Sequence, residues 1–338
     1  MRAVVLAGGF GTRLRPLTLT RPKQMLPIVN VPLVERMIYH VAQFGVDEVV
    51  LSLGYRPDDI EAAYPTGTCP DSRGGQVKLQ YAVEPEPLDT AGAIRFAALA
   101  AGIDERFLVF NGDVLTDLDV GRFLAFHEKS GAEATIHLHQ VDDPSRFGVV
   151  DKDDDGRVLA FVEKPAPGTA PSNLINAGSY VLEASVLDRI PGERRVSVER
   201  ETFPQLVADG SLFATTAGST YWVDVGTPHH YLAAQLDLLD GAWGPPLGGV
   251  DPTATIDPAA SVVRSVVGAG AVIEAGARVE RSVLLPKARV AAGACVCDSA
   301  LGEGAVVGPG AEVLGWTVVG DGESIAADSR LDGARLPG

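Results

Sequence analysis

The first segment that suggests chemistry is a glycine-rich loop, which directly follows a short apolar run at residues 3–6. Glycines let the backbone approach a phosphate closely and point several N–H groups at it. Arg13 within the loop adds a forked donor that suits phosphate oxygens, and Lys23 follows between two prolines as a point charge. The loop alone also fits a tight turn, and it completes neither the P-loop nor the dinucleotide fingerprint. These residues together predict a triphosphate site.

Two motifs in series carry a resemblance to a known family. Residues 8–18 read Gly-Gly-Phe-Gly-Thr-Arg-Leu-Arg-Pro-Leu-Thr, and Pro-Lys follows at 22–23. This series resembles the opening motif of the sugar-phosphate nucleotidyltransferases, and the resemblance extends over nearly the whole chain. It implies that the loop and the lysine hold the triphosphate of a nucleotide. The implied nucleotide-binding residues in this segment are Leu6, Ala7, Gly8, Gly9, Gly11, Thr12, Arg13 and Lys23.

Two aspartates lie in further motifs of that family. Asp113 ends the run Phe-Asn-Gly-Asp, and Asp224 lies in Trp-Val-Asp-Val-Gly-Thr-Pro at residues 222–228. Taken singly, each reads as an ordinary strand-end or helix-capping aspartate. A hard divalent cation prefers carboxylate and phosphate oxygens, so the resemblance implies Mg²⁺ as cofactor, with both aspartates as ligands. The implied catalytic residues are Arg13, Lys23, Asp113 and Asp224.

The sugar half of the site is implied by two later motifs. Arg-Phe-Gly-Val-Val at 146–150 and Phe-Val-Glu-Lys-Pro at 161–165 both resemble family segments. By resemblance, Lys164 holds the sugar 1-phosphate, and Glu163 and Asn176 accept hydrogen bonds from ring hydroxyls. A Glu-Lys pair on its own also fits a solvated strand edge. The implied sugar-phosphate residues are Asn111, Gly112, Gly148, Glu163, Lys164 and Asn176.

The expected reaction is in-line attack by the sugar phosphate on the α-phosphorus of the nucleotide, with pyrophosphate as the leaving group. A phosphate monoester is already anionic near neutral pH, so no general base is needed. A non-catalytic, nucleotide-sugar-sensing subunit is the non-enzyme alternative. That alternative is disfavoured because the chain keeps its cationic and acidic site residues.

The base and the sugar are suggested by residues 84–92. Glu84 carries only acceptors, which suit the N1–H and N2–H₂ edge of guanine. Together with the Phe-Asn-Gly-Asp run, the Arg-Phe-Gly-Val-Val run and a short terminal β-helix, this segment most resembles the mannose-1-phosphate guanylyltransferase branch of the family. We therefore expect GTP and mannose 1-phosphate as substrates. Asp89, next to Thr90 in the implied nucleotide site, departs from the family because relatives place glycine there. Glucose-1-phosphate thymidylyl- or uridylyltransferase is the alternative.

Alternating apolar runs and helical patterns predict an α/β catalytic domain at residues 1–240. It is expected to have a Rossmann-like, mostly parallel sheet with ligands beyond the carboxyl ends of the strands, and a denser mixed region later. Predicted strands are 3–6, 49–53, 77–83, 107–110, 135–141, 158–162 and 175–182, and predicted helices are 33–44, 90–101 and 229–239.

A glycine- and proline-rich linker is predicted at 241–249, and a short left-handed parallel β-helix of hexapeptide repeats at 250–330. Paired hexads restart at 250, 267, 285, 301 and 319, in steps of 17, 18, 16 and 18 residues. Acyl transfer on this scaffold normally needs a histidine base, and none follows His230. Self-association into a homo-oligomer through the β-helix is expected instead. The hexads open at Val250, Ile256, Val267, Ile273, Leu285, Leu301, Val307, Val319 and Ile325.

Net charge, the N-terminal segment and the cysteines indicate which classes of partner and which location to expect. A net charge of −16 disfavours nucleic acid and anionic membranes. The N-terminus shows no signal peptide, and the three cysteines lack metal-type spacing, so free thiols and a cytoplasmic location are expected. His137 and His139 share a strand face with zinc-compatible spacing, but a packed or solvated face is the default because a third ligand is lacking.

Overall fold

The computed structural model describes residues 1–338 except residues 72, 193 and 338. The described chain divides into two compact units. The sheet unit consists of Met1–Gly9 and Met37–Trp222, and the β-helix unit consists of Phe10–Arg36 and Val223–Gly338. Each unit is therefore built from two separate stretches of sequence.

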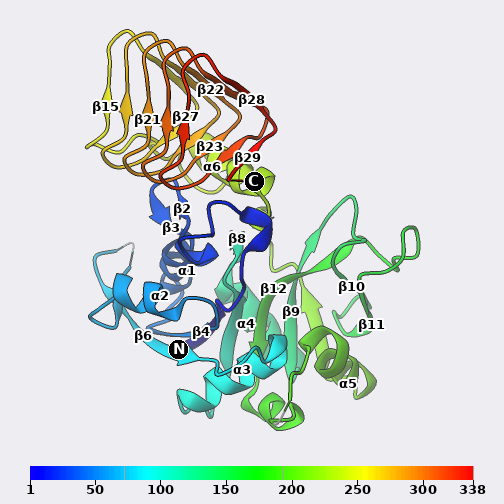
Figure 1. The fold of residues 1–338 in the computed structure, drawn as a ribbon. Helices are drawn as coiled ribbons and strands as arrows, with labels where there is room; N and C mark the ends of the chain where they lie inside the picture. Colours follow the sequence, from blue (N-terminus) through cyan, green and yellow to red (C-terminus); the bar gives the residue numbers. More distant parts are fainter. Residues whose placement is uncertain (72, 193, 338) are drawn as a thin grey trace. The chain divides into compact units, whose positions relative to one another are not determined.

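A ten-stranded sheet lies in the sheet unit (Figure 1): eight strands follow the order β11-β10-β12-β7-β1-β4-β6-β5, β9 pairs with β12, and β13 pairs with β9. The central strands β7, β1, β4 and β6 are parallel, whereas β12, β10 and β11 continue the sheet in antiparallel pairs. A parallel centre with a mixed flank confirms the predicted α/β class. The ten strands are β1 Arg2–Leu6, β4 Glu48–Leu53, β5 Thr68–Pro70, β6 Gln76–Val83, β7 Phe107–Asn111, β9 Ala134–Gln140, β10 Gly148–Lys152, β11 Val158–Glu163, β12 Leu174–Leu182 and β13 Leu212–Thr215. The short strand β8 Val114–Thr116 lies outside this sheet.

Both faces of the sheet are covered, because Ala3, Val4 and Val5 of β1 point alternately to opposite faces and all have 0% exposure. The small residues of α3 (Asp89–Ala100) let it pack closely on β1, β4 and β6. The predicted elements agree with the observed ones within two residues at each end, while α2, α4 and α5 were not predicted. The other helices of this part of the chain are α1 Leu33–Ala42, α2 Pro57–Ala63, α4 Val120–Ser130, η3 Ala184–Arg189, the π-helical turn η4 Val198–Thr202 and α5 Phe203–Ala208.

In the β-helix unit, α6 (Pro228–Asp240) anchors the N-terminal stretch. The Tyr231 hydroxyl and the Gln235 side-chain amide both donate to the Pro27 carbonyl at 2.8 Å. The Val29 N–H donates to Gln235 Oε1 at 2.6 Å, so a buried amide fixes this turn from both sides. The short elements here are η1 Thr12–Leu14, η2 Lys23–Met25, β2 Pro27–Ile28, β3 Val31–Pro32 and β14 Trp222–Asp224.

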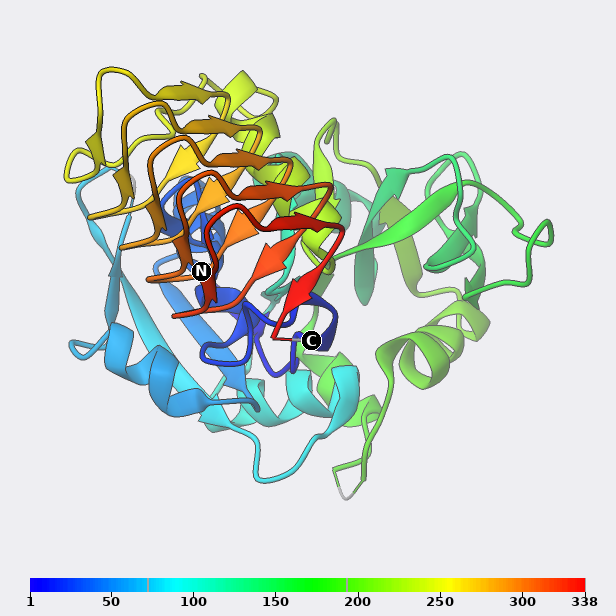
Figure 2. The ribbon, with the colours of Figure 1, turned by 45° about the horizontal axis from the view of Figure 1, so that its top comes forward.

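Residues from 255 onward form three five-stranded parallel sheets, the arrangement expected of a left-handed β-helix, and Figure 2 shows the coils as a stack. The strands are β15 Thr255–Ile256, β16 Ser261–Val263, β17 Val266–Val267, β18 Val272–Ile273, β19 Arg278–Glu280, β20 Val283–Leu284, β21 Arg289–Val290, β22 Cys295–Cys297, β23 Ala300–Leu301, β24 Val306–Val307, β25 Glu312–Leu314, β26 Val318–Val319, β27 Ser324–Ile325, β28 Arg330–Asp332 and β29 Arg335–Leu336.

The register of the repeats differs from the predicted one at a single coil. Val267, Leu284, Leu301 and Val319 stack in one interior column, in steps of 17, 17 and 18 residues. The predicted hexad start at Leu285 was therefore wrong by one residue, because Leu284 is the inward-facing member of that apolar pair. A third inward column, Val279, Val296 and Val313, was not predicted.

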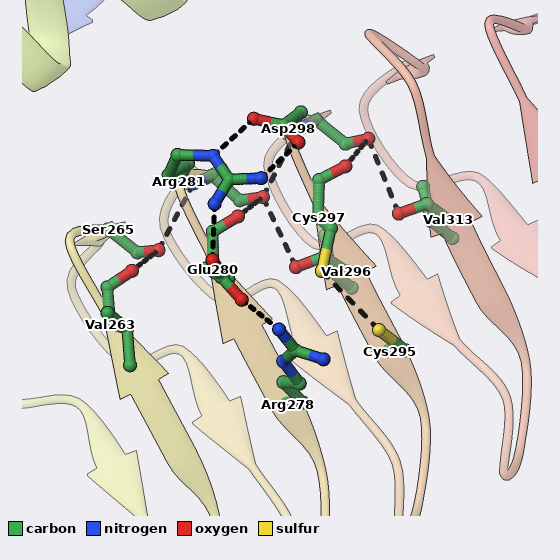
Figure 3. A network of polar contacts seen from close by, with 12 residues as sticks. Val263, Ser265, Arg278, Glu280, Arg281, Cys295, Val296, Cys297, Asp298 and Val313 are labelled. Carbon is green, nitrogen blue, oxygen red and sulfur yellow. Dashed lines mark hydrogen bonds and ion pairs between the residues drawn. The ribbon is translucent and has the colours of Figure 1, made fainter.

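One corner of the β-helix is held by a ladder of buried hydroxyls (Figure 3). Ser265 Oγ accepts the Ser282 N–H at 3.1 Å, and Ser282 Oγ accepts the Ser299 N–H at 3.2 Å. Each hydroxyl also donates to a carbonyl two residues before it in its own coil. The corner therefore selects serine for its hydrogen bonds as well as for its small size.

None of the described helices is long and apolar enough to span a membrane.

Candidate active site

The phosphate loop (residues 11–23) belongs to the β-helix unit and is shaped by its own contacts. Gly11 has a φ of 59°, and a Cβ there would lie 3.1 Å from the Lys23 Cβ, so glycine is favoured at this turn. The Thr18 hydroxyl donates to the Gly11 carbonyl at 2.8 Å. Thr12–Leu14 then form one 3₁₀ turn, in which the first two side chains are exposed. The loop thus presents polar groups on a defined backbone.

Two cations of the phosphate loop face one carboxylate. Lys23 Nζ lies 3.7 Å from Asp224 Oδ1, and Arg13 Nη2 lies 3.9 Å from Asp224 Oδ2. The Lys23 side chain is only 6% exposed, whereas that of Arg13 is 66% exposed. A Cβ at Gly226 would lie 2.6 Å from Arg13 Nη2, so glycine leaves room for the guanidinium. The cluster carries more positive than negative charge, which favours an added anion.

Asp224 is itself positioned by the start of α6. The His230 Nδ1 atom lies 2.9 Å from the Asp224 carbonyl oxygen, and the Thr227 hydroxyl accepts the His230 N–H at 3.2 Å as the helix cap. The pair His229-His230, for which no catalytic role was predicted, therefore begins a helix that holds the aspartate backbone.

Glu84 follows β6 in the sheet unit, and protein donors fix both of its carboxylate oxygens. The Ser52 hydroxyl donates to Oε1 at 3.1 Å, and the Leu88 N–H donates to Oε2 at 3.0 Å. A Cβ at Gly8 would lie 3.2 Å from Glu84 Oε1, so glycine lets the backbone approach the carboxylate. A carboxylate has about four lone-pair sites, and acceptor capacity therefore remains for a ligand.

Asp89 occupies a backbone conformation that glycine adopts readily. Its φ is 62°, and its Oδ1 accepts the Thr90 N–H at 2.9 Å. Aspartate tolerates this left-handed region better than most residues, because its short side chain can bond locally. Aspartate at this position is thus compatible with the left-handed backbone that the structure shows.

The end of β7 carries Asn111, Gly112 and Asp113. The Gly112 N–H donates to the Leu6 carbonyl at 2.9 Å, and a Cβ at Gly112 would lie 2.5 Å from that oxygen. Only glycine fits so close to the backbone of β1. The two strand ends, with Leu6 and Ala7 on one and Asp113 on the other, are therefore held side by side.

Three carboxylates surround the buried hydroxyl of Tyr180. Burial is the main cause of the raised pKa of Tyr180, and the negative charges of Glu199, Glu163 and Asp113 add to it. The sheet unit thus places acidic side chains from the turn after β7, from β11 and from η4 near one phenol. Such a group can accept hydrogen bonds from a polyhydroxyl ligand.

Gly148 and Glu163 are register partners on β10 and β11. A Cβ at Gly148 would lie 2.6 Å from the Phe161 Cζ and 3.0 Å from Glu163 Oε2. The Lys164 Nζ lies 2.9 Å from Glu163 Oε1, and the side chains are 60% and 18% exposed, respectively. The carboxylate is thus sheltered, while the ammonium group remains accessible to an anion.

Asn176 is held by internal hydrogen bonds. Its Nδ2 donates to the Tyr180 hydroxyl at 2.9 Å, and its Oδ1 accepts the Gly178 N–H at 3.0 Å. The Trp222 Nε1–H donates to the Ala177 carbonyl at 2.9 Å and steadies the same bend. Asn176 was predicted to accept from sugar hydroxyls, and its contacts also make it a support of the β12 bulge.

Glu199 is a candidate site residue that the sequence reasoning missed. Its Oε2 accepts hydrogen bonds from the hydroxyls of Ser197 at 2.8 Å and Thr90 at 3.3 Å. Desolvation raises the pKa of Glu199, and the nearby charge of Glu163 adds to that rise. The run Glu-Arg-Glu is typical of a solvated surface, and only the π-helical turn shows that Glu199 is half-buried.

The predicted site residues fall on both units. The sheet unit holds Leu6, Ala7, Gly8, Gly9, Glu84, Asp89, Thr90, Asn111, Gly112, Asp113, Gly148, Glu163, Lys164 and Asn176, and the β-helix unit holds Gly11, Thr12, Arg13, Lys23 and Asp224.

Within the described residues, no group of three or more His, Cys, Asp or Glu side chains could hold a metal ion. His137 and His139 of β9 were considered above as a pair with zinc-compatible spacing. His137 is fully buried, and the His139 ring stacks on Trp222 with centroids 5.5 Å apart. Both histidine rings are therefore packed within the protein.

Two family models match successive parts of the chain. The family model described as nucleotidyl transferase matches residues 2–241, and the model described as GMPPB C-terminal domain matches residues 247–336. A mannose-1-phosphate guanylyltransferase of Mycobacterium tuberculosis is 40% identical over 301 residues, covering 86% of this chain and 81% of the relative.

Solved structures are similar over about two thirds of the chain. HddC from Yersinia pseudotuberculosis is 31% identical with a TM-score of 0.58, covering 69% of this chain and 97% of that protein. The same protein complexed with GMP-PN is 30% identical with a TM-score of 0.55, covering 69% of this chain and 97% of that protein.

Proposed function

The chain belongs to the nucleotidyl transferase family, and from this premise we propose that it transfers the guanylyl group of GTP to mannose 1-phosphate. The products are GDP-mannose and pyrophosphate. The observation that carries the assignment is the 40% identity, across 86% of the chain, with a mannose-1-phosphate guanylyltransferase. The match of residues 247–336 to a GMPPB C-terminal domain supports the same branch.

The phosphate loop is proposed to bind the triphosphate. Arg13 and Lys23 already lie within 4 Å of one carboxylate, so the loop gathers two cations at a single point. In-line attack by the sugar phosphate places negative charge on the leaving pyrophosphate, and fixed cations stabilise that charge without reorganising. The exposed Arg13 can form a bidentate contact, while the buried Lys23 acts as a point charge.

Guanine recognition is proposed for Glu84 with the backbone at Asp89 and Thr90. Because Ser52 and Leu88 fix the Glu84 carboxylate, its remaining lone pairs have a defined direction before any base arrives. A fixed acceptor pair suits the N1–H and N2–H₂ donors of guanine. The left-handed backbone at Asp89 supports a role for the N–H groups at the start of α3.

The sugar phosphate is proposed to bind at Gly148, Glu163 and Lys164. The exposed ammonium group of Lys164 is suited to the phosphate, and the sheltered Glu163 carboxylate is suited to ring hydroxyls. Asn111, Gly112 and Asn176 complete the proposed pocket, with Asn176 also supporting the bend at residues 177–178.

Asp113 and Asp224 are proposed to hold Mg²⁺. Two carboxylates offer hard oxygen donors, and Mg²⁺ normally completes its coordination with phosphate oxygens and water, so the donor chemistry fits. When bound, the ion would neutralise charge on the phosphates. Binding of Mn²⁺ with GTP, followed by electron paramagnetic resonance, is expected to weaken at least tenfold in Asp113→Asn and in Asp224→Asn. Unchanged Mn²⁺ binding in both variants would contradict this assignment.

Residues 1–240 are proposed as the catalytic domain, 241–249 as a linker and 250–330 as the β-helix domain. Self-association through the β-helix is also proposed, because flat parallel sheets and open coil ends favour pairing. Sedimentation equilibrium of the whole chain tests this: a multiple of 35.4 kDa supports an oligomer, and 35.4 kDa itself contradicts it.

Product analysis tests the reaction itself. GTP carrying one sulfur on the α-phosphorus provides a chiral centre whose configuration can be followed into the product. A single in-line displacement inverts that configuration and yields a thio-substituted GDP-mannose. Retention would point to a covalent enzyme intermediate, and absence of any nucleotide sugar would reject the proposed function.

A further inference from the structure

The β-helix and the phosphate loop are in direct contact within one compact unit. Three separate points of contact join them. Arg335, on the last coil, donates from Nη1 to the carbonyl oxygens of Arg13 and Arg15, each at 3.2 Å. The Arg13 carbonyl lies within the 3₁₀ turn that presents the Arg13 side chain, and Arg15 caps the C-terminal end of that turn.

The second point is a close backbone approach. A Cβ built at Gly320 would lie 3.1 Å from the Cβ of Pro16, and also 3.0 Å from the Leu336 carbonyl. Glycine at this corner therefore lets Pro16 of the loop rest against the coil. A larger side chain at 320 would have to displace either the loop or the last strand.

The third point is an ion-pair cluster at the end of the loop. Arg21 Nη2 lies 2.6 Å from Asp321 Oδ2 and 3.0 Å from Glu303 Oε2, two carboxylates on successive coils. Thr20 donates to the same Asp321 oxygen. Burial alone would lower the pKa of Arg21, yet that pKa is raised because the two carboxylates hold the charge. Only Pro22 separates this anchored arginine from Lys23.

The contact also reaches the segment that carries Asp224. The Trp316 ring, at a corner of the β-helix, lies against the His229 ring with centroids 4.1 Å apart. His229 is adjacent to His230, whose Nδ1 lies 2.9 Å from the Asp224 carbonyl oxygen. The β-helix therefore contacts both the loop and the start of α6, next to the segment that carries Asp224.

We propose that the last coils of the β-helix position the phosphate loop for the nucleotide, with Arg335, Asp321 and Glu303 as positioning residues. None of them needs to touch substrate. Their effect acts through the backbone of residues 13–15 and 20–23, which would otherwise have to be ordered when the triphosphate binds. A loop ordered in advance spares that entropic cost and holds its cations in place. The β-helix is thus part of the nucleotide site as well as a candidate assembly surface. This inference rests on the proposed function for the identity of the nucleotide.

The sharpest test compares Arg335→Ala with Arg330→Ala in the full-length protein. Both arginines lie on the last coil, but Arg330 pairs with Glu312 and Asp332 of the β-helix, whereas Arg335 donates to the phosphate loop. We expect Arg335→Ala to raise the KM for GTP about tenfold, or about 1.4 kcal/mol in affinity. The KM for mannose 1-phosphate and the thermal midpoint should match those of Arg330→Ala. Arg335→Lys keeps a donor and should restore part of the affinity.

Asp321→Asn provides a second variant that keeps the shape of the side chain and removes its charge. It should weaken GTP binding in the same selective way, because Arg21 then loses the charge of the nearer of its two carboxylate partners, Asp321 and Glu303. An unchanged KM for GTP in both Arg335→Ala and Asp321→Asn would overturn the inference. Equal losses for both substrates, or equal losses in Arg330→Ala, would also overturn it, because they indicate a general loss of stability.

Direct binding separates this inference from the proposed function. Binding of fluorescent GTP, ATP, UTP and dTTP analogues is measured without any sugar phosphate. If the wild type binds a triphosphate other than GTP, the base assignment fails, but Arg335→Ala must still weaken that binding about tenfold. If the wild type forms nucleotide sugar normally and Arg335→Ala binds GTP as tightly, the positioning role fails while the function stands.

Discussion

Replacement of Lys23 by methionine tests the phosphate loop most severely. The change keeps the length of a side chain that is only 6% exposed, and it removes a charge located 3.7 Å from Asp224 Oδ1. The variant therefore fills the same space, but it leaves the Asp224 carboxylate with Arg13 as the remaining cation of the pair. An incoming triphosphate then meets the Asp224 carboxylate after one of the two cations facing it has been removed.

The expected magnitude follows from that geometry. At an effective dielectric constant of about 20, unit charges 3.7 Å apart interact by about 4.5 kcal/mol, an upper figure because Asp224 is 23% exposed. Loss of one preorganised charge-stabilising donor typically costs about 2.7–4 kcal/mol in the transition state. We therefore expect kcat/KM for GTP and mannose 1-phosphate to fall by about 10²- to 10³-fold.

The assay is continuous release of pyrophosphate under saturating Mg²⁺, with Lys78→Met as the matched control. Lys78 makes a similar pair with Glu48 at 3.5 Å, but its side chain is 61% exposed and it lies outside every proposed site. The control should keep wild-type turnover. A kcat/KM of Lys23→Met within threefold of the wild type would refute the role given to this lysine. If Asp224→Asn lowers the activity of the Lys23→Met variant further, Asp224 contributes to the reaction beyond its ion pair with Lys23.

Three further outcomes are expected. Gly148→Ala places a Cβ 2.6 Å from the Phe161 Cζ and should raise the KM for mannose 1-phosphate about tenfold without changing that for GTP. Burial lowers the pKa of His137 to about 3, so only the unfolded chain protonates this ring just below pH 6.5. The unfolding free energy should therefore fall by up to about 1.4 kcal/mol per unit as the pH drops from about 6.5 to 3, and urea titrations of His137→Phe should show a flatter slope. Burial is the main cause that raises the pKa of Cys297 to about 11, so iodoacetamide should alkylate this thiol more slowly at pH 7.5 than it alkylates free cysteine.

Much of the fold was predictable because its signals are local. Buried parallel strands are short apolar runs, and the small-residue pattern of α3 can be recognised from its own sequence, without knowledge of what packs against it. The β-helix was predictable for a similar reason, because inward-facing aliphatic side chains recur from coil to coil at nearly constant spacing. The misplaced start at Leu285 shows the limit of this reasoning: two adjacent leucines fit the pattern equally well, and only pairing with Leu301 selects Leu284.

Chemistry-bearing residues were predictable where a motif fixed their context. The glycine-rich loop, Lys23 and the two aspartates were singled out on that basis. Glu199 was not, because its burial depends on a π-helical turn packed beside residues that are distant in sequence. Arg335 was not either, since an arginine near the end of a chain carries no local sign that it binds carbonyls more than 300 residues away. Such contacts arise only when the β-helix has folded.

The central claim is that this chain joins guanylyl and mannosyl phosphate groups, and a substrate panel tests it most directly. Initial rates of pyrophosphate release are measured for GTP, ATP, UTP and dTTP, each with mannose 1-phosphate and with glucose 1-phosphate. The highest kcat/KM is predicted for GTP with mannose 1-phosphate. A preference for dTTP or UTP with glucose 1-phosphate, or no release with any pair, would contradict the account.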